Sequence, residues 1–332
     1  MSIGGLITLK KVYSFEPTPP ELTGEQAGFI LGGQGNLWAE FIPTPDHAEY
    51  MALPRMTALS EVLWSSREQR NWDSFQQRLQ RQFLRFDRMG VHYSRGSFAV
   101  QILTSSDSAS GRIQIQMSTE QFDPEIRYTL DGTAPSKNSP LYTSPFPADT
   151  SVTVRAAIFM GDSLMERPAE KHIIIHKAVG AYTRYEIPPN YRYPTWTSGP
   201  LTDGLRGSNR YNDGYWQGFQ GDDLKVTVDL GKVITVHQVS SGFLQQQWGW
   251  IFMPAKVIIA LSEDQQNWKE FTVINTISPR AEEIIVKDFE VITGGITARY
   301  IRVNAVNPGV CPEWHPGAGD RTWIFADEII VN

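Results

Sequence analysis

The feature that most constrains this chain is a change in the spacing of its hydrophobic residues near Gly96. Before that point apolar residues recur mainly at intervals of three and four, which buries one face of a helix. After it they alternate with polar residues, as in strands with one buried face. A chain of 332 residues has room for two or three domains, since single domains usually have about 100–200 residues. The pattern therefore predicts an α/β segment followed by all-β domains.

The first 95 residues contain one short apolar run and two helical patterns. The run at 29–31 predicts a strand, which then enters the glycine-rich stretch that ends at Trp38. Thr44 and Pro45 are suited to begin a helix, which should continue to about Trp64 with Pro54 kinking or dividing it. A second helix is expected over 72–89, because aromatic and leucine residues form one stripe there and Gly90 follows.

The rest of the chain has the signature of strands. Alternating segments around Ile113, Ile126 and Val152, with a tight turn at Asp131-Gly132, predict a small domain over 96–177. A second all-β domain should occupy 178–332. Its expected strands contain Val226, Val228 and Leu230 before a turn at Gly231, then Val257 and Ile259, Ile301 and Val303, and Ile329 and Val331. The two longest loops, 244–254 and 307–323, are candidates for binding.

Composition excludes several classes of protein. A net charge of −6 argues against a nucleic-acid partner, because phosphate binding requires clustered Lys and Arg. The sequence contains no apolar run long enough for a membrane span or a signal peptide. Cys311 is the only cysteine, so neither an intrachain disulfide nor a cysteine metal site is possible.

Three groups of motifs give the chain a family resemblance. The run LGGQGNLWAE, followed by EYMALPRMTALSEVLWS, resembles the last βα unit of glycoside hydrolase family 20 β-N-acetylhexosaminidases. EIRYTLDGTAPSKNSPLYTSPF resembles the small β domain that follows the barrel in chitobiase-like members, and LTDGLRGSNRYNDGYWQGF with WIFADEIIV resembles the discoidin (F5/8 type C) module. The resemblance implies part of a (β/α)8 barrel over 1–95, a small β-sandwich over 96–177 and a discoidin-like jelly roll over 178–332.

For catalysis, the resemblance implies substrate-assisted hydrolysis of terminal N-acetylhexosamine on glycans, without a catalytic cofactor. The sugar's own acetamide attacks the anomeric carbon, an exception to the usual two-carboxylate scheme. The Asp-Glu pair that orients the acetamide and supplies the acid is expected upstream of Met1, in a missing N-terminal barrel portion. No catalytic residue is therefore assigned, and this chain alone is expected to be inactive. Trp38 and Glu40 remain as substrate-binding residues, and an extracytoplasmic location is implied.

In the last domain, the two long loops carry Trp248, Trp250, Trp314 and His315, with Glu313 and Asp320 beside them. Aromatic faces and polar groups together suit sugar recognition, although several of these rings could instead plug the end of the sandwich. If they bind sugar the loops must converge, with Trp248 or Trp250 in reach of Trp314 or His315 and partly exposed. Asp203, Asp213 and Glu328 are candidate ligands for a structural calcium, which takes about six to eight oxygens.

Three interpretations of the whole chain stay open. It could be part of a hexosaminidase, a module for carbohydrate binding or surface attachment, or a structural brace for a catalytic barrel. If residues 1–95 are part of a parallel barrel, they should expose an unusual apolar surface or borrow a partner, since they lack the strand–helix units that normally cover such a sheet.

Overall fold

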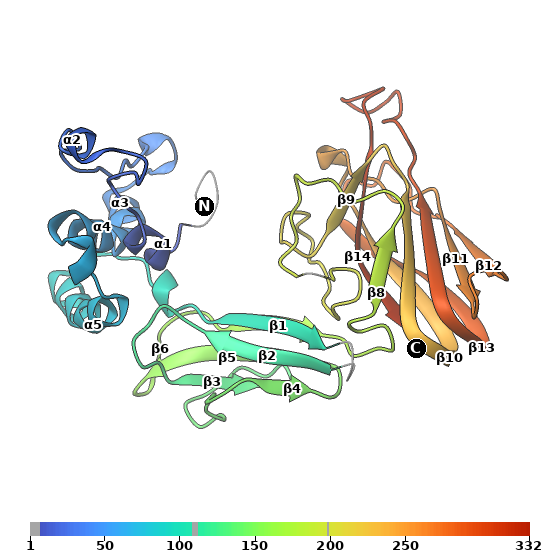
Figure 1. The fold of residues 1–332 in the computed structure, drawn as a ribbon, viewed down its shortest axis with the longest axis horizontal. Coiled ribbons are helices and arrows are strands. Elements are labelled where there is room, and N and C mark those ends of the chain that lie inside the picture. Colours follow the sequence, from blue (N-terminus) through green and yellow to red (C-terminus); the bar gives the residue numbers. More distant parts are fainter. Residues whose placement is uncertain (1–6, 108–111, 198) are drawn as a thin grey trace. The chain divides into compact units, whose positions relative to one another are not determined.

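The structure is a computed structural model that describes residues 7–107, 112–197 and 199–332. The chain divides into two compact units, each formed by several stretches of sequence (Figure 1). The first unit comprises Met1–Ile102, Met117–Thr143 and Arg155–Glu170, and the second comprises Leu103–Gln116, Ser144–Val154 and Lys171–Asn332. Most of the regular structure is β-sheet, and the helices are concentrated in the first unit.

The helices predicted at 45–64 and 72–89 are present in the first unit, which also contains two short helices that the sequence pattern did not indicate. The helices are α1 (Leu9–Tyr13), α2 (Gly24–Ala27), α3 (Pro45–Ala52), α4 (Arg55–Trp64) and α5 (Trp72–Met89), with short 3-10 turns η1 (Ala39–Phe41), η2 (Arg67–Gln69) and η3 (Gly96–Phe98). The Thr44 side chain accepts a hydrogen bond from the His47 amide at 3.2 Å, which caps α3. Pro54 separates α3 from α4, and Gly90 ends α5 at a φ of +69°.

The stripe of α5 forms the core of this unit. Phe75, Leu79, Phe83 and Phe86 are all buried, as their spacing predicts. The Tyr13 ring stacks on Phe75 with centroids 4.7 Å apart, and its hydroxyl donates to Glu61 at 2.9 Å. Arg78 of α5 also bonds to Glu61. Glu61 thus joins α1, α4 and α5 and has a structural role.

The strand predicted at 29–31 is wrong. Among the described residues 7–95 there is no strand, and Phe29 and Leu31 lie in an irregular segment with 76% and 98% of their surfaces exposed. A strand needs the backbone of a neighbour to complete its hydrogen bonds, and none of the described segments 7–95 pairs with this run.

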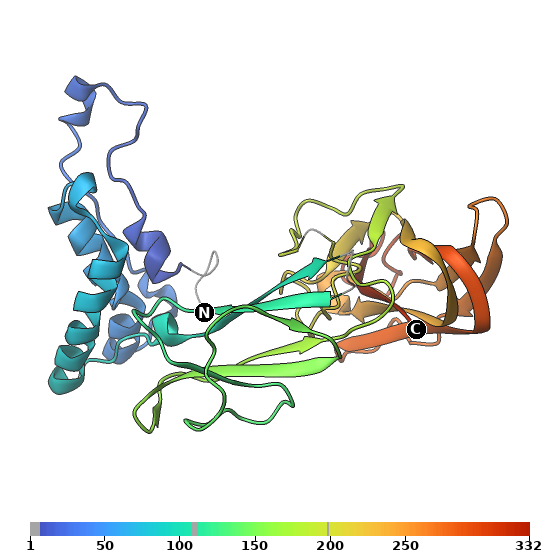
Figure 2. The same cartoon turned by 60° about the horizontal axis from the view of Figure 1, so that its bottom comes forward.

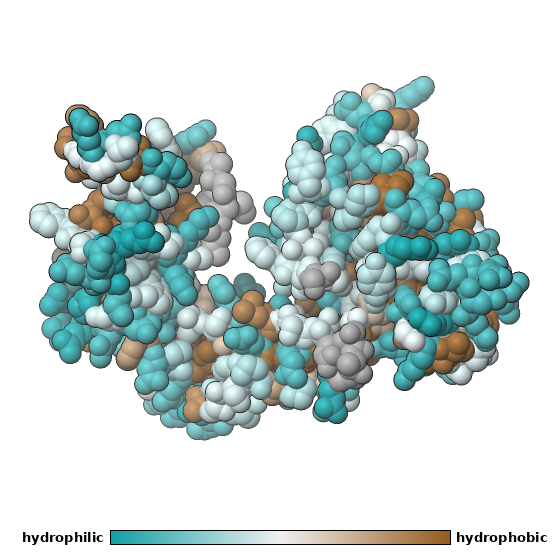
Figure 3. Space-filling view, viewed as in Figure 1, coloured by the Kyte–Doolittle hydropathy of each residue, from teal (hydrophilic) through white to brown (hydrophobic). Residues whose placement is uncertain are grey.

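Several large apolar side chains are exposed on residues 7–95. Trp64 is 91% exposed and Trp38 is 77% exposed. Figure 3 shows hydrophobic side chains gathered at the surface over the N-terminal helices. A groove of about 460 Å³ is lined mainly by Ile7, Val12, residues 33–37 and the apolar residues Met51, Met56 and Leu59.

Seven short strands follow the helices in the described sequence, and their residues are divided between the two units. They are β1 (Gln101–Asp107), β2 (Arg112–Ser118), β3 (Ile126–Thr129), β4 (Phe146–Ala148), β5 (Val152–Met160), β6 (Ser163–Leu164) and β7 (Ala169–Ile173). The described residues form one sheet with the order β1-β2-β4, and another in which β5 pairs with β3, β6 and β7. In β2 the buried residues alternate with exposed ones, as predicted. The turn predicted at Asp131-Gly132 follows β3, with Gly132 at a φ of +78°.

The second unit is built around one large antiparallel sheet. Its strands are β8 (Tyr182–Tyr185), β9 (Gln217–Gln220), β10 (Leu224–Gln245), β11 (Lys256–Ser262), β12 (Lys269–Ile274), β13 (Ile285–Val306) and β14 (Trp323–Val331). Their order is β12-β11-β13-β10-β14-β9, and β8 also pairs with β10. Strands β10 and β13 run side by side along their length, with Leu224 opposite Ala305 at one end and Gln245 opposite Ile285 at the other (Figures 1 and 2). Predicted strand residues such as Val226, Val257, Val303 and Ile329 fill the core.

The turn predicted at Gly231 is wrong. The structure has one strand, β10, that continues through this residue. The pairing register with β13 shifts between Asp229 and Ile234, and Gly231 has a φ of +77°. Glycine in this conformation permits an irregularity inside a paired strand. Gly231 therefore marks a change of backbone direction, as expected, but the result is a bulge within β10 and not a turn between two strands.

In the part of the chain that the structure describes, no helix is long and apolar enough to cross a membrane.

Candidate functional site

The two long loops of the second unit lie against each other at the start of β14. The Gln246 amide donates to Ile251 O at 3.0 Å, which closes the first loop on itself. The Trp323 amide donates to Trp250 O at 2.8 Å, and the Phe252 amide donates to Trp323 O at 2.9 Å. These backbone bonds attach the first loop to the end of the second, so the predicted convergence of the loops is confirmed.

His315 joins the loops from inside. It is 5% exposed, and its Nδ1 accepts from the Gly317 amide at 3.0 Å. Its Nε2 lies 2.9 Å from Gln247 O and must donate to it, because a carbonyl only accepts. Both ring nitrogens are therefore used within the protein. His315 has the features of a positioning residue.

Trp250 forms one wall of the site and is partly exposed. It ends the 3-10 turn η4 (Gln247–Gly249) with a φ of +60°, a left-handed conformation. Its ring lies edge-on to His315 with centroids 5.3 Å apart, and its Nε1 donates to Asp320 Oδ2 at 3.3 Å. A methyl group on Gly317 would overlap the Trp250 indole. The second loop thus needs glycine at this position to seat the ring.

The other two tryptophans are arranged differently. Trp314 is partly buried, with the Arg280 guanidinium 5.1 Å above its ring and Phe252 on another side. One face of Trp314 is therefore covered by a cation. Trp248 is 64% exposed at the tip of the first loop.

A pocket of about 290 Å³ opens beside Trp250. It is lined by Gln220, Gly249, Trp250, Asp320, Arg321 and Trp323. Trp323 is 7% exposed and packs edge-on against Tyr193 with centroids 5.1 Å apart. The pocket therefore combines an aromatic wall and a rigid floor with a carboxylate, a guanidinium and an amide.

The three predicted calcium ligands do not meet at one point. Asp213 braces its own loop by accepting from the amides of Ser208 and Tyr215, at 2.6 and 3.0 Å. Asp203 accepts from the Leu205 amide at 2.9 Å and from the Thr197 hydroxyl. Across the described ranges no group of three or more His, Cys, Asp or Glu residues could hold a metal ion. A structural calcium on these three residues is therefore not shown.

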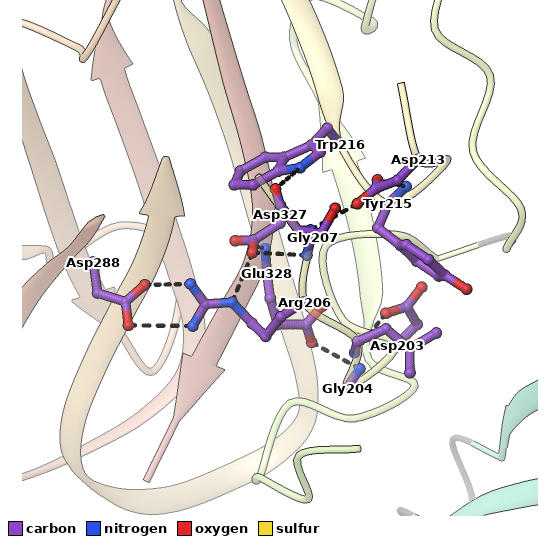
Figure 4. A network of polar contacts seen from close by, with 12 residues as sticks. Asp203, Gly204, Arg206, Gly207, Asp213, Tyr215, Trp216, Asp288, Asp327 and Glu328 are labelled. Atoms are coloured by element: carbon purple, nitrogen blue, oxygen red, sulfur yellow. Dashed lines mark hydrogen bonds and ion pairs between the residues drawn. The ribbon is translucent and has the colours of Figure 1, made fainter. Parts of the chain in front are cut away.

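Glu328 lies at the centre of a buried network instead (Figure 4). Its side chain is 0% exposed, and its Oε1 accepts from the Gly204 amide at 2.9 Å and from His176 Nε2 at 2.8 Å. Burial, reinforced by the charge of Asp203, raises the pKa of Glu328 well above its usual value. Burial also lowers the pKa of His176 to about 4. Both shifts favour the neutral forms of the pair.

The neighbouring residue Asp327 belongs to an ion pair. It is 0% exposed, and its Oδ2 accepts from Arg206 Nε at 2.6 Å and from the Gly207 amide at 3.1 Å. Arg206 also donates to both oxygens of the more exposed Asp288, at 2.6 and 3.2 Å (Figure 4). Arg206 thus joins the loop after Asp203 to strands β13 and β14.

Trp38 and Glu40 are not brought into a pocket. Trp38 precedes the turn η1, Glu40 lies within it, and both side chains are exposed. The apolar groove of this unit includes Leu37 but neither of these two residues.

Sequence reasoning missed several polar residues of the second unit. Gln220 and Arg321 line the pocket, and His176 and Arg206 hold the buried carboxyls. Arg321 adjoins the predicted Asp320 and could have been included with it. Gln220 carried no signal, because it comes from a strand that only folding brings to the loops.

Comparison with known proteins gives three family matches in sequence order. Residues 1–67 match the glycosyl hydrolase family 20 catalytic domain, residues 104–169 the chitobiase/beta-hexosaminidase C-terminal domain, and residues 190–324 the F5/8 type C domain. A beta-hexosaminidase of Porphyromonas gingivalis is 28% identical over 221 residues, which is 61% of this chain and 28% of that protein. A beta-hexosaminidase of Akkermansia muciniphila is 38% identical over 81 residues, or 23% of this chain and 16% of that protein.

The chain therefore spans between 8% and 28% of the length of four curated relatives that it matches. Among solved structures, a Streptococcus pneumoniae fucose binding module is 16% identical, with a TM-score of 0.30 over 47% of this chain and 93% of that one. Taken together, the chain matches in order a segment of the glycosyl hydrolase family 20 catalytic domain, the chitobiase/beta-hexosaminidase C-terminal domain and the F5/8 type C domain, and the four curated relatives are named as hexosaminidases.

Proposed function

We propose that this chain is the C-terminal part of a β-N-acetylhexosaminidase, and that its last domain binds glycan. The proposal assigns residues 1–95 to the end of the catalytic barrel, 96–177 to a small β-sandwich and 178–332 to a discoidin-like module. The order of the three family matches supports it, as do relatives that are named beta-hexosaminidases. The whole protein would remove terminal N-acetylhexosamine by substrate-assisted hydrolysis and would act outside the cytoplasm, where glycan substrates are exposed.

In the complete enzyme, Trp38 would form the floor under the terminal sugar and Glu40 would accept hydrogen bonds from its outer hydroxyls. Both side chains are exposed in this chain, and 77% of the Trp38 surface is accessible to solvent. An exposed aromatic ring with an adjacent carboxylate suits a site that other segments complete. The remaining part of the barrel is accordingly a proposed partner of this surface.

The first prediction concerns activity. The purified chain should not hydrolyse para-nitrophenyl N-acetyl-β-glucosaminide above the rate of the Glu40→Ala variant. Among its described residues 7–95 no strand forms, so no barrel surrounds Trp38, and a missing general acid alone typically removes about 10²–10⁴-fold of rate. Release of nitrophenol measures this. Turnover by the chain that disappears in Glu40→Ala would contradict the prediction.

One observation carries the proposal of glycan binding. The loops at 246–255 and 307–322 meet, and they present the partly exposed Trp250 above a pocket that contains Asp320 and Arg321. An apolar ring face beside groups that fix hydrogen-bond directions is the combination that small polar ligands such as sugars require.

The second prediction tests binding. The full chain should bind members of a diverse glycan array, and Trp250→Ala should weaken that binding by about tenfold or more, a change equivalent to about 1.4 kcal/mol. Gly317→Ala should weaken it too, because the added methyl group displaces the Trp250 ring. Trp64→Ala, at a ring 91% exposed in the other unit, is the matched control and should bind normally. A chain that binds none of the glycans would instead be a structural brace.

A further inference from the structure

We propose that the Trp250 pocket takes a single neutral sugar ring and discriminates against charged sugars, through Asp320 and Arg321 acting in opposite directions. This inference rests on the proposed glycan binding and specifies its ligand class. It depends on three features of the pocket: its size, the hydrogen-bonding capacity of its lining, and the state of its two charged groups.

The size of the pocket suits one ring. Its volume of about 290 Å³ lies just below the range of about 300–1,000 Å³ found for ligand pockets. Trp250 bounds it on one side, and Trp323, which is 7% exposed, forms its floor. A terminal sugar fits such a pocket, whereas the interior of a polysaccharide requires an open groove.

The polar lining calls for a ligand that both donates and accepts. Asp320 accepts from Trp250 Nε1 at 3.3 Å, through Oδ2. A carboxylate only accepts, so the oxygen that remains needs a ligand donor, and a guanidinium only donates, so it needs a ligand acceptor. A sugar hydroxyl does both, and the amide of Gln220 at the end of β9 can complement either role.

Arg321 is available to a ligand. Within the described part of the chain, no hydrogen bond or ion pair holds its side chain, and it forms no ion pair with Asp320. Its aliphatic stem runs close over Gly221, where a methyl group would come within 2.8 Å of its Cδ. Gly221 has a φ of +71°, so both the turn and the passage of Arg321 require glycine. The stem of Arg321 is thus held over the turn at Gly221, and the residue lines the pocket.

The two charges give the selectivity. An acidic sugar is attracted by Arg321, but its carboxylate also meets Asp320, while a protonated amino sugar meets Arg321. Like charges brought within a few ångströms of each other repel, and because Asp320 and Arg321 are both exposed this repulsion should be greatest at low salt. A neutral ring with adjacent hydroxyls uses both groups and incurs neither repulsion.

The experiment is titration calorimetry of the full chain with four probes: N-acetylglucosamine, galactose, glucuronate and protonated glucosamine. At least one neutral sugar should bind more tightly than both charged ones. Asp320→Asn and Arg321→Gln should each weaken its binding by about tenfold, since hydrogen bonds to charged groups contribute about 1.5–3 kcal/mol. Glu290→Gln and Arg192→Gln are controls at exposed charges that do not line the pocket, and they should bind as the parent chain does.

The preference among sugars separates recognition from a loss of structure. Relative to the neutral sugar, Asp320→Asn should improve the binding of glucuronate, and Arg321→Gln should improve that of glucosamine. Disruption of the loops would weaken all four probes in parallel and would shift neither ratio. Three outcomes would overturn this inference while the proposed glycan binding stands. They are glycan binding that the two variants leave unchanged, a parallel loss of all four probes in both variants, and tighter binding of a charged sugar by the parent chain. A chain that binds no glycan on the array overturns the proposed binding itself.

Discussion

Replacing Glu328 with alanine should lower the free energy of unfolding of the large sheet by at least about 3 kcal/mol. The Glu328 side chain is 0% exposed and accepts from the Gly204 amide and from His176 Nε2. Its removal leaves two buried donors without partners, each of which costs about 1–3 kcal/mol, and it also leaves a cavity. Urea unfolding followed by tryptophan fluorescence measures the change, because Trp216 and Trp323 are buried in this unit.

Glu328→Gln is the matched control, since its amide oxygen can accept both hydrogen bonds. The pKa of Glu328 is raised by burial and by Asp203, so the folded protein favours the protonated acid. The stability contributed by such a group is full below its unfolded pKa of about 4.5 and is lost as the pH rises through the higher folded value. Glutamine does not ionise, so Glu328→Gln should gain stability relative to the parent as the pH rises. Equal losses in the Ala and Gln variants at every pH would contradict this account.

The second large effect is expected for Arg206→Met, with a loss of about 3–5 kcal/mol, the range for removing one partner of a buried ion pair. Arg206 is the cation beside Asp327, which is 0% exposed. The pKa of Asp327 is already raised to about 6 by burial, against the opposing charge of Arg206. In Arg206→Met, which lacks that charge, the pKa of Asp327 should rise further. The same unfolding transition reports the loss.

Two comparisons check the role of Arg206. Asp288→Asn removes its more exposed partner and should cost no more than about 1 kcal/mol, as for surface pairs. A raised folded pKa gives stability that is full below the unfolded value of about 3.8 and is lost as the pH rises through the folded value. The deficit of Arg206→Met should therefore be smaller at pH 5 than at pH 7.5. A loss that is independent of pH would show that Arg206 acts through packing of its stem.

The sequence predicted the helices of the first unit well because their signals are local. Thr44 and Pro45 at the start of α3, Pro54 at its end and Gly90 after α5 each act within one turn of backbone. Alternating residues likewise marked β2, β11 and β14. In these cases the physical cause of the element lies within the element itself.

The errors arose where the outcome depends on distant residues. The apolar run at 29–31 satisfies the pattern of a strand, but pairing requires a neighbour that this unit does not provide. Asp203, Asp213 and Glu328 have the oxygens that calcium prefers, but the described structure does not gather all three, and several of their oxygens accept from amides or from the ring of His176. The convergence of the two loops follows from strand pairing, because Lys256 after the first loop pairs with Val306 before the second, and Leu244 before the first pairs with Phe325 after the second. Gln220 and Arg321 became part of the pocket only through the register of β9 and β14.

The position of β14 in the sheet also determines when this unit can fold during protein synthesis. Residues 323–331 form a strand between β10 and β9, and Phe325 and Ile329 from it are fully buried. A nascent chain that has left the ribosome only as far as β13 lacks this strand, so β10 has an open edge and Glu328 has not yet met His176. Such edges invite pairing with other chains. The interval before β14 emerges is therefore when this unit is most prone to aggregate and has most need of a chaperone.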